Sequence, residues 1–434
     1  MKITLKNGNF ITDNSKDCTF GCYFALSNSN AKFKNAAKSL GAKIITPKEA
    51  KTLLNLDDSI KLVGITGTNG KTTTASAIYE TLLNLGFKAG ISGTRGAFIN
   101  GKQIADKGLT TSQILETLNY LKLAKEAGCE YFVMEVSSHA IAQNRIEGLE
   151  FALKIFTNLS QDHLDFHKTI EEYARVKSSF FKDITPKLIN GDDKNLSYDK
   201  TNSMTYGFTS DATFYAFDYS LKGGINATIK TNGEEIKFQS SLQGKFNLYN
   251  LLCAFGALKF LTKKSSDEIS KALSKFSGAP GRVEIVSRNP LVIVDFAHTP
   301  DGIEKVLDAL KDEELIVVFG AGGDRDKTKR PVMGQIVQKY AKIAIVTSDN
   351  PRSEEPISII EDIVSKIELG DNIIKEVDRK KAINLALNLA KNGEAVVILG
   401  KGDEPYQEIK SVKYPFSDKD VVRDILNLNN KGNI

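Results

Sequence analysis

The chain has 434 residues, of which 41% are hydrophobic and 26% are charged, and its formal net charge is +5. This length is too great for one hydrophobic core and predicts two or three domains, while the composition excludes disordered and fibrous proteins. The net charge is small and the lysines are scattered along the chain, so no nucleic-acid partner is indicated, although a small polyanionic substrate is compatible with it.

The sequence also bears on location and on cysteine chemistry. No apolar run approaches the roughly 20 residues that span a bilayer, and the first residues read as a strand without the apolar core of a signal peptide. We therefore expect a cytoplasmic protein without membrane insertion. Cys18 and Cys22 form the only close pair among four cysteines, so buried free thiols are expected instead of metal ligands.

The predicted fold class is α/β, and three segments with their own patterns follow one another. Residues 1–58 predict a small α/β domain. Its strands are expected at 3–5, 10–11, 23–26 and 42–45, with a helix at 32–40 and a short helix within 47–58.

The second segment, residues 59–281, alternates apolar runs with helical patterns, which predicts a parallel sheet with crossover helices. Within 205–242 the pattern changes to strand alternation, and Asn232-Gly233 predicts a type I′ hairpin. An antiparallel sheet is therefore expected inside or beside the parallel one. The expected strands are 62–65, 131–136, 151–157, 225–230 and 236–238, and the expected helices include 113–127 and 170–181.

The third segment, residues 282–434, follows Gly278-Ala279-Pro280-Gly281 and predicts a second open α/β domain. In such sheets the carboxyl ends of the strands carry the chemistry. The expected strands are 291–294, 315–319, 343–346 and 396–399, and the expected helices lie near 302–310, 331–341, 357–367 and 380–391.

The most informative motif lies between an expected strand and an expected helix, and consists of Gly67, Thr68, Asn69, Gly70, Lys71, Thr72 and Thr73. The N–H groups of such a turn and the positive helix end bind phosphates, Lys71 reaches the outer phosphates, and the Thr72 hydroxyl can ligate Mg²⁺. The match to the P-loop pattern is not strict, because its first glycine falls on Ile65. A glycine-rich turn with an exposed lysine is the alternative, but the flanking strand and helix favour ATP binding.

Two polar clusters also follow strands. Glu135 ends the strand expected at 131–136, where a P-loop protein needs a carboxylate for Mg²⁺. The second cluster runs from Thr157 to His167. A single histidine is by default a core or surface residue, but all four lie beside such loops: His139, His163, His167 and His298.

These motifs resemble those of the Mur ligases, the ATP-dependent amide-forming enzymes of bacterial peptidoglycan precursor synthesis. The resemblance implies a UDP-binding domain at 1–58, a central ATPase domain at 59–281 and a C-terminal, Rossmann-like amino-acid-binding domain at 282–434. The residues that carry it are 67–72, 134–140, 158–165, 281–284, 295–301, 322–326, 329–331, 347–352 and 400–402.

The resemblance implies a reaction. It points to the branch of the family that adds meso-2,6-diaminopimelate to the D-glutamyl carboxylate of UDP-N-acetylmuramoyl-L-alanyl-D-glutamate. ATP would convert that carboxylate into an acyl phosphate, which the amino group attacks. Two Mg²⁺ ions and an N6-carboxylysine at Lys177 are implied, although Lys177 taken alone reads as a solvated helix lysine. The implied catalytic residues are Lys71, Lys177, His163 and Arg282, and the implied metal-site residues are Thr72, Glu135, His163 and carbamylated Lys177.

The resemblance also implies three binding sets. For ATP they are Gly67, Thr68, Asn69, Gly70, Lys71, Thr72, Thr73, Asn247, Asn250, Arg282, Asp295 and His298. For the UDP-sugar dipeptide they are Ser15, Thr110, Thr111, Ser137, Gln143 and Arg145, although Thr110-Thr111-Ser112 taken alone is typical of a helix N-cap. For diaminopimelate they are Arg325, Asp349, Asn350, Pro351, Arg352, Gly400 and Glu404.

Arg352 is the residue that favours diaminopimelate, because that amino acid has a distal carboxylate that lysine lacks and a buried arginine can bind it in a bidentate manner. Glu404 would face the distal ammonium. Asp403 stands where the family usually has histidine. The alternatives are a ligase that uses L-lysine, a folylpolyglutamate synthetase, and a non-enzymatic P-loop switch. We expect a monomer whose partners are small molecules.

Overall fold

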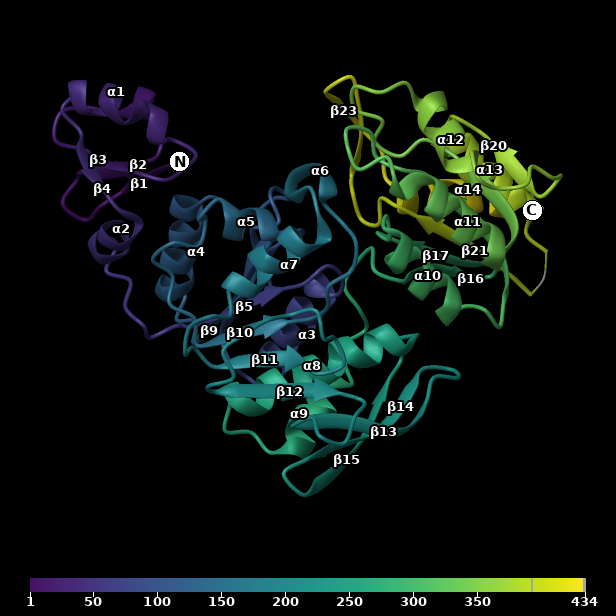
Figure 1. Cartoon of the computed structure of the whole chain (residues 1–434), viewed down its shortest axis with the longest axis horizontal. Helices are drawn as coiled ribbons and strands as arrows, with labels where there is room; N and C mark the ends of the chain where they lie inside the picture. Colours follow the sequence, from purple (N-terminus) through teal and green to yellow (C-terminus); the bar gives the residue numbers. More distant parts are fainter. Residues whose placement is uncertain (392, 432–434) are drawn as a thin grey trace.

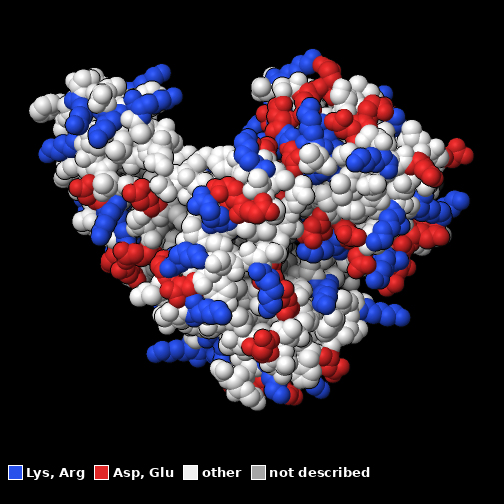
Figure 2. All heavy atoms as spheres, viewed as in Figure 1, with Lys and Arg blue, Asp and Glu red and all other residues white. Residues whose placement is uncertain are grey.

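The chain is built from three α/β units, each with its own main sheet (Figure 1). The structure is a computed structural model that describes residues 1–391 and 393–431. The N-terminal and C-terminal units lie on either side of the central unit, and a notch separates the two outer units in the space-filling view of Figure 2. We propose that the units are three domains, 1–58, 59–281 and 282–434.

The N-terminal unit is a four-stranded sheet in the order β1-β2-β3-β4, in which only the β1–β2 pair is antiparallel. Helix α2 begins at a capping box, in which Thr46 and Glu49 satisfy each other's backbone N–H groups, and Pro47 occupies the first turn. The predicted strands and helices are confirmed. They are β1 (Lys2–Thr4), β2 (Phe10–Thr12), β3 (Tyr23–Ala25), β4 (Lys43–Ile45), α1 (Lys34–Ser39) with the preceding 3-10 turn η2 (Ala31–Phe33), and α2 (Pro47–Leu53). The short 3-10 helix η1 (Ser15–Asp17) was not predicted.

The central unit is an eleven-stranded sheet in the order β15-β14-β13-β12-β11-β10-β5-β9-β6-β7-β8. Its middle strands are apolar on both faces because helices cover both: α3 and α8 pack on one side, and α4 and α7 on the other. The strands are β5 (Lys61–Thr66), β6 (Ala89–Gly93), β7 (Gly96–Ile99), β8 (Lys102–Ala105), β9 (Tyr131–Glu135), β10 (Leu153–Phe156), β11 (Lys187–Asn190), β12 (Ser203–Gly207), β13 (Phe214–Ser220), β14 (Ile225–Thr231) and β15 (Glu234–Ser240). The helices are α3 (Lys71–Asn84), α4 (Ile114–Glu126), α5 (Ser138–Ala142), α6 (Leu164–His167), α7 (Ile170–Ser179), α8 (Lys245–Leu261) and α9 (Ser266–Leu273).

The antiparallel part of the central unit extends the parallel sheet at its edge. Strand β13 pairs in parallel with β12, and β14 and β15 follow as an antiparallel hairpin. The predicted type I′ turn is confirmed, because Asn232 and Gly233 have φ values of 46° and 83°. Sequence reasoning missed β6–β8 and β11, which are short strands without a long apolar run.

The C-terminal unit is a six-stranded sheet in the order β16-β17-β21-β18-β19-β20, parallel except for the edge strand β16. Helices α10, α11 and α12 cover one face, and α13 and α14 cover the other. The predicted Rossmann-like alternation is confirmed, whereas β16, β20, β22, β23 and α14 were not predicted. The strands are β16 (Glu284–Arg288), β17 (Leu291–Asp295), β18 (Glu314–Phe319), β19 (Ala341–Val346), β20 (Ile373–Lys375), β21 (Glu394–Leu399), β22 (Tyr406–Ile409) and β23 (Val412–Pro415). The helices are α10 (Pro300–Ala309), α11 (Lys329–Tyr340), α12 (Pro356–Val364), α13 (Arg379–Leu389) and α14 (Asp418–Lys431).

Two predictions about whole-chain properties can be compared with the structure. All four cysteines are buried free thiols, as expected. Among the described residues, no helix is both long and apolar enough to cross a membrane. On the face seen in Figure 2, lysines and arginines are interspersed with aspartates and glutamates.

Candidate active site

The phosphate-binding loop joins β5 to α3, as predicted. Gly67 and Gly70 have positive φ values of 150° and 84°, and Gly70 is the N-cap residue of α3. A Cβ atom at Gly67 would overlap the Thr157 hydroxyl, and one at Gly70 would overlap the Asn250 side chain. Glycine is therefore required at both positions, and the loop backbone can approach a phosphate closely.

Lys71 folds back over this loop. Its Nζ donates to the carbonyl oxygens of Gly67 and Thr68 at 2.8 and 2.9 Å. Burial lowers the pKa of Lys71, while the charges of Glu135 and Asp162 oppose that shift. When a nucleotide binds, its outer phosphates would take the place of these two carbonyl oxygens as partners of the Lys71 ammonium.

Glu135 lies against the first turn of α3. The Thr72 hydroxyl donates to Glu135 Oε2 at 3.0 Å, and Thr94 donates to the same carboxylate through its N–H at 2.9 Å and its hydroxyl at 3.2 Å. Arg282 Nη2 donates to Thr72 Oγ1 at 3.3 Å. A hydroxyl and a carboxylate in contact suit Mg²⁺, which takes one or two protein oxygens together with water and substrate phosphates.

The predicted metal set is only partly assembled by protein atoms. Among the described residues, no group of three or more His, Cys, Asp or Glu side chains is arranged to hold a metal ion. In residues 1–391, no hydrogen bond joins His163 to Thr72 or Glu135. An ion at Thr72 and Glu135 would therefore depend on phosphate oxygens and water for its other ligands.

Three of the histidines gather as their sequence positions suggested. The ring centroid of His139 lies 4.9 Å from that of His163 and 5.6 Å from that of His167. Burial lowers the pKa of His163 to about 3, against the opposing charge of Asp162, and burial lowers that of His167 to about 4. Both rings are therefore neutral at pH 7, which is the form that can ligate a metal.

Lys177 on α7 is buried beside the phosphate loop. Its Nζ donates to Thr66 Oγ1 at 3.5 Å and lies 4.6 Å from the centroid of the Tyr173 ring. Burial lowers its pKa well below the ordinary value, and the nearby charge of Lys71 adds to that shift, while Asp162 opposes it. The solvated helix lysine that the sequence alone suggested is thus wrong, because the side chain is 1% exposed.

A cavity of about 800 Å³ opens beside the phosphate loop, between the central and C-terminal units. On α8, Asn250 accepts from the Thr74 hydroxyl at 3.3 Å and donates to Asn247 at 3.2 Å, so both amides face this cavity from one helix. Seven of the residues predicted to bind ATP line it: Asn69, Gly70, Thr73, Asn247, Asn250, Arg282 and Asp295.

Asp295 shapes the wall of this cavity. Its carboxylate accepts from the backbone N–H groups of Val283 and Ala297 at 2.7 and 2.6 Å, and burial raises its pKa while Arg282 opposes the shift. It therefore orients the turn that carries Arg282. His298 does not line the cavity, and its Nδ1 lies 2.9 Å from the carbonyl oxygen of Phe296.

Four of the residues predicted for the UDP-sugar dipeptide form one hydrogen-bonded group. The Thr111 hydroxyl donates to Ser137 Oγ at 3.3 Å, and Arg145 donates to the Thr111 carbonyl oxygen at 3.0 Å and to Gln143 at 2.6 Å. Thr110 adjoins this group and contacts the Thr94 hydroxyl at 3.3 Å.

Two details of this set differ from the sequence interpretation. The N-cap residue of α4 is Gln113, which makes no side-chain cap bond, so the threonines are not the cap. Ser15 lies apart, in η1 of the N-terminal unit. The N-terminal unit contacts the start of α4 instead, where Ser29 donates to Gln113 at 3.3 Å.

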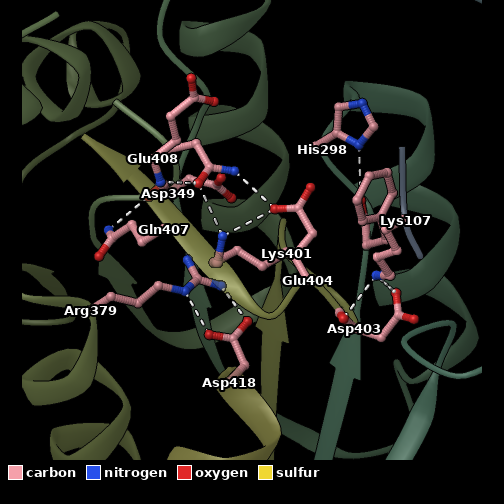
Figure 3. A network of polar contacts seen from close by, with 12 residues as sticks. Lys107, His298, Asp349, Arg379, Lys401, Asp403, Glu404, Gln407, Glu408 and Asp418 are labelled. Atoms are coloured by element: carbon pink, nitrogen blue, oxygen red, sulfur yellow. Dashed lines mark hydrogen bonds and ion pairs between the residues drawn. The ribbon is translucent and has the colours of Figure 1, made fainter. Parts of the chain in front are cut away.

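The predicted amino-acid pocket lies at the carboxyl ends of β19 and β21. Glu404 Oε2 accepts from Asn350 Nδ2 at 2.9 Å. It also accepts from Lys401 Nζ at 3.1 Å, a contact drawn in Figure 3. Gly400 has a φ of 113°, and a Cβ there would overlap the Asp349 carboxylate. These polar groups from two strand ends converge on one place, which suits a zwitterionic ligand.

Arg352 is half-buried, which corrects the expectation of a buried arginine. Its side chain is 23% exposed. Its Nη1 donates to the Gly323 carbonyl oxygen at 2.7 Å, and its Nε lies 3.5 Å from Glu408. Arg325 is exposed and donates to the Asp324 carbonyl oxygen at 3.2 Å. Both cations therefore remain able to reach an anionic ligand.

Two buried ion pairs that sequence reasoning missed brace this pocket. Arg379 and Asp418 are both 0% exposed and form two hydrogen bonds of 2.7 Å (Figure 3). Arg379 also donates to the Leu399 carbonyl oxygen at 2.9 Å. Arg330 binds Glu354 at 2.8 and 3.0 Å. The sequence did not predict these two pairs, because the acidic partners lie 39 and 24 residues away from the arginines.

Sequence reasoning also missed polar residues beside the nucleotide cavity. Asp192, just after β11, accepts from the Tyr249 hydroxyl at 2.7 Å. Asp301, at the start of α10, accepts from Asn69 at 2.7 Å and from Ser160 at 3.2 Å, and so ties the C-terminal unit to the phosphate loop. The position of Asp192 after a strand is the signal that could have identified it.

Comparisons with known proteins bear on this site. The model of the Mur ligase middle domain matches residues 65–258, and that of the Mur ligase, glutamate ligase domain matches residues 281–402. The chain belongs to the Mur ligase family. It is 48% identical, over 96% of both chains, to UDP-N-acetylmuramoyl-L-alanyl-D-glutamate–2,6-diaminopimelate ligase of Wolinella succinogenes.

Solved structures of similar fold include ligases with different substrates. The chain is similar to a UDP-N-acetylmuramoyl-L-alanyl-D-glutamate–2,6-diaminopimelate ligase with a TM-score of 0.67, at 29% identity, over 97% of this chain and 95% of the other. It is equally similar in shape to a Mycobacterium tuberculosis folylpolyglutamate synthase, with a TM-score of 0.68 at 17% identity, over 82% and 91%. That second likeness shows the fold alone, so fold does not separate the two activities.

Proposed function

We propose that this chain ligates meso-2,6-diaminopimelate to the D-glutamyl carboxylate of UDP-N-acetylmuramoyl-L-alanyl-D-glutamate, with ATP as the energy source, in cytoplasmic peptidoglycan precursor synthesis. One observation supports the view that the nucleotide and amino-acid regions belong to the same active site. Arg282, at the start of the C-terminal unit, donates to Thr72 of the phosphate loop at 3.3 Å, so the nucleotide and amino-acid halves meet there. The 48% identity to a diaminopimelate ligase supports the choice of substrates.

The first step moves the γ-phosphoryl group of ATP to the glutamyl carboxylate. Phosphoryl transfer depends mainly on positioning and on neutralising charge. Lys71 and Arg282 would supply positive charge to the transferred group, while the asparagines of α8 hold the nucleoside. Thr72 and Glu135 fit Mg²⁺, which supplies further positive charge to the phosphate oxygens when bound.

The second step is attack of the acceptor amine on the acyl phosphate, with loss of phosphate. The group of Thr111, Ser137 and Arg145 would hold the muramoyl-dipeptide, and Asn350 with Glu404 would hold the incoming amino acid. Arg352 would bind the distal carboxylate. The two substrates then approach each other at the interface of the central and C-terminal units.

We further propose that Lys177 carries a carbamate and that two Mg²⁺ ions bind. A neutral amine reacts with CO₂, and the lowered pKa of Lys177, caused first by burial, favours the neutral form. Carbamylation would also replace a buried positive charge beside Lys71 with an anionic oxygen donor suited to a hard metal. We propose a monomer that acts on small molecules.

The test is phosphate release from ATP in the presence of UDP-N-acetylmuramoyl-L-alanyl-D-glutamate, with each candidate amino acid added in turn. Rapid release that requires both the dipeptide substrate and diaminopimelate is expected. Equal release with lysine would favour the lysine-using ligase, and release with a folate and glutamate would favour the folylpolyglutamate synthetase. Hydrolysis that ignores every acceptor would favour a P-loop switch.

A further inference from the structure

An ion-pair cluster joins the central unit directly to the loop of the amino-acid pocket. Lys107 follows β8, and its Nζ donates to Asp403 Oδ1 at 2.6 Å and to the Asp403 main-chain oxygen at 2.8 Å (Figure 3). Arg95, between β6 and β7, places its Nε 3.8 Å from Asp403 Oδ2. Two cations of the central unit therefore meet one carboxylate that lies 296 residues further along the chain than Lys107.

Asp403 occupies a position that touches both halves of the proposed site. The next residue, Glu404, accepts from Asn350 and Lys401 in the amino-acid pocket. The backbone of Asp403 also packs against Gly281, so closely that a Cβ atom at Gly281 would overlap the Asp403 backbone nitrogen. Gly281 immediately precedes Arg282, which contacts the phosphate loop.

The contact differs from an ordinary surface salt bridge in two ways. The side chains of Lys107, Asp403 and Arg95 are only 21%, 18% and 25% exposed, so solvent screens them less than an exposed pair. The bond from Lys107 to the main-chain oxygen of Asp403 also constrains the loop backbone, which a contact between side chains alone would not do.

We propose that Lys107 and Asp403 are positioning residues for the acceptor amino acid, which hold the 400–404 loop against the central unit so that Glu404 and Asn350 face the distal end of that amino acid. The proposal rests on the proposed function. On this proposal, the acceptor pocket is fully formed only while the C-terminal unit contacts the central unit. Arg95 provides a second, weaker attachment for the same carboxylate.

Three variants test this role in the full-length protein. Lys107→Met should raise the KM for diaminopimelate about fivefold to tenfold, as expected for a half-buried ion pair, with kcat and the KM for ATP changed less than about twofold. Asp403→Asn keeps the shape of the side chain and weakens the same ion pair, but it leaves the bond from Lys107 to the main-chain oxygen, so a smaller rise of the same KM is expected. The double variant should lose less than the sum of the two single losses, because both variants remove the ion pair that they share.

Two further measurements separate positioning from general stability. The charge-reversed pair, Lys107→Asp with Asp403→Lys, should recover part of the KM but not all of it, because an aspartate cannot donate to the main-chain oxygen. Lys375→Met is the matched control, since Lys375 binds Glu361 at 2.9 Å within the C-terminal unit and touches no other unit through that pair. Its KM values should equal those of the wild type, and thermal midpoints confirm that all variants are folded.

Different results would contradict the positioning role and the proposed function. Wild-type turnover with an unchanged diaminopimelate KM in both single variants would overturn the positioning role. Equal rises in the KM of all three substrates, or strictly additive losses in the double variant, would also overturn it, because they indicate a general loss of domain contact or two independent effects. A wild type that releases no phosphate with diaminopimelate would instead refute the proposed function, and the inference with it.

Discussion

Arg352→Ala removes the guanidinium that we assign to the distal carboxylate of diaminopimelate. Loss of one partner of a buried, hydrogen-bonded charge pair costs about 2–5 kcal/mol. The side chain of Arg352 is 23% exposed and its Nε lies 3.5 Å from Glu408, so the loss should fall near the lower end. About 2–3 kcal/mol corresponds to a fall of roughly 30- to 160-fold in kcat/KM for diaminopimelate.

The assay compares diaminopimelate and lysine as acceptors, at saturating ATP and UDP-sugar dipeptide, by initial rates of phosphate release. The wild type should prefer diaminopimelate strongly, because lysine leaves Arg352 unpaired. The variant should lose that preference, while its efficiency with lysine changes less than about twofold. Lys410→Ala is the control, since Lys410 is adjacent in space, 74% exposed, and contacts Arg352 through its backbone.

Two results would refute this reasoning. Equal or better use of lysine by the wild type would mean that the pocket was assigned to the wrong amino acid. A parallel loss for both amino acids in Arg352→Ala would mean that the arginine supports the loop through its bond to the Gly323 carbonyl oxygen and does not contact the acceptor.

Three further predictions concern the phosphate loop, the buried lysine and stability. Lys71→Ala should lower kcat by about 10²- to 10³-fold, by analogy with loss of one oxyanion donor, and near-normal turnover would contradict the phosphate role. Lys177→Ala should lose most activity and regain part of it with added short carboxylic acids, which fill the vacated anionic site; full activity without them would show that no carbamate is needed. Arg330 lowers the pKa of Glu354 to about 2 from 4.5, so this carboxylate stabilises the fold above pH 4.5, and that contribution is lost as the pH falls toward 2. Glu354→Gln should therefore lower the thermal midpoint at pH 7 and flatten its acid dependence, and an unchanged acid dependence would contradict that assignment.

Local patterns in the sequence were sufficient for much of the fold and for the phosphate loop. The glycines at 67 and 70 and the Asn232-Gly233 turn were predictable because positive φ is a property of a few neighbouring residues. Apolar runs located the central parallel strands β5, β9, β10, β17, β18, β19 and β21, because burial on both faces demands continuous hydrophobicity. The short strands β6, β7 and β8 were not predicted, because none of them contains a continuous apolar run.

The arrangement of charges around the site could not be predicted from local sequence patterns. The burial of Lys177, the partial exposure of Arg352 and the pairing of Lys107 with Asp403 depend on which distant segments the fold brings together. The sequence by itself determined which residue types stand at the ends of strands, and hence that phosphate and amino-acid chemistry was available. Only the tertiary structure determined their protonation, their partners and their reach, because desolvation and Coulomb interactions act through space and not along the chain.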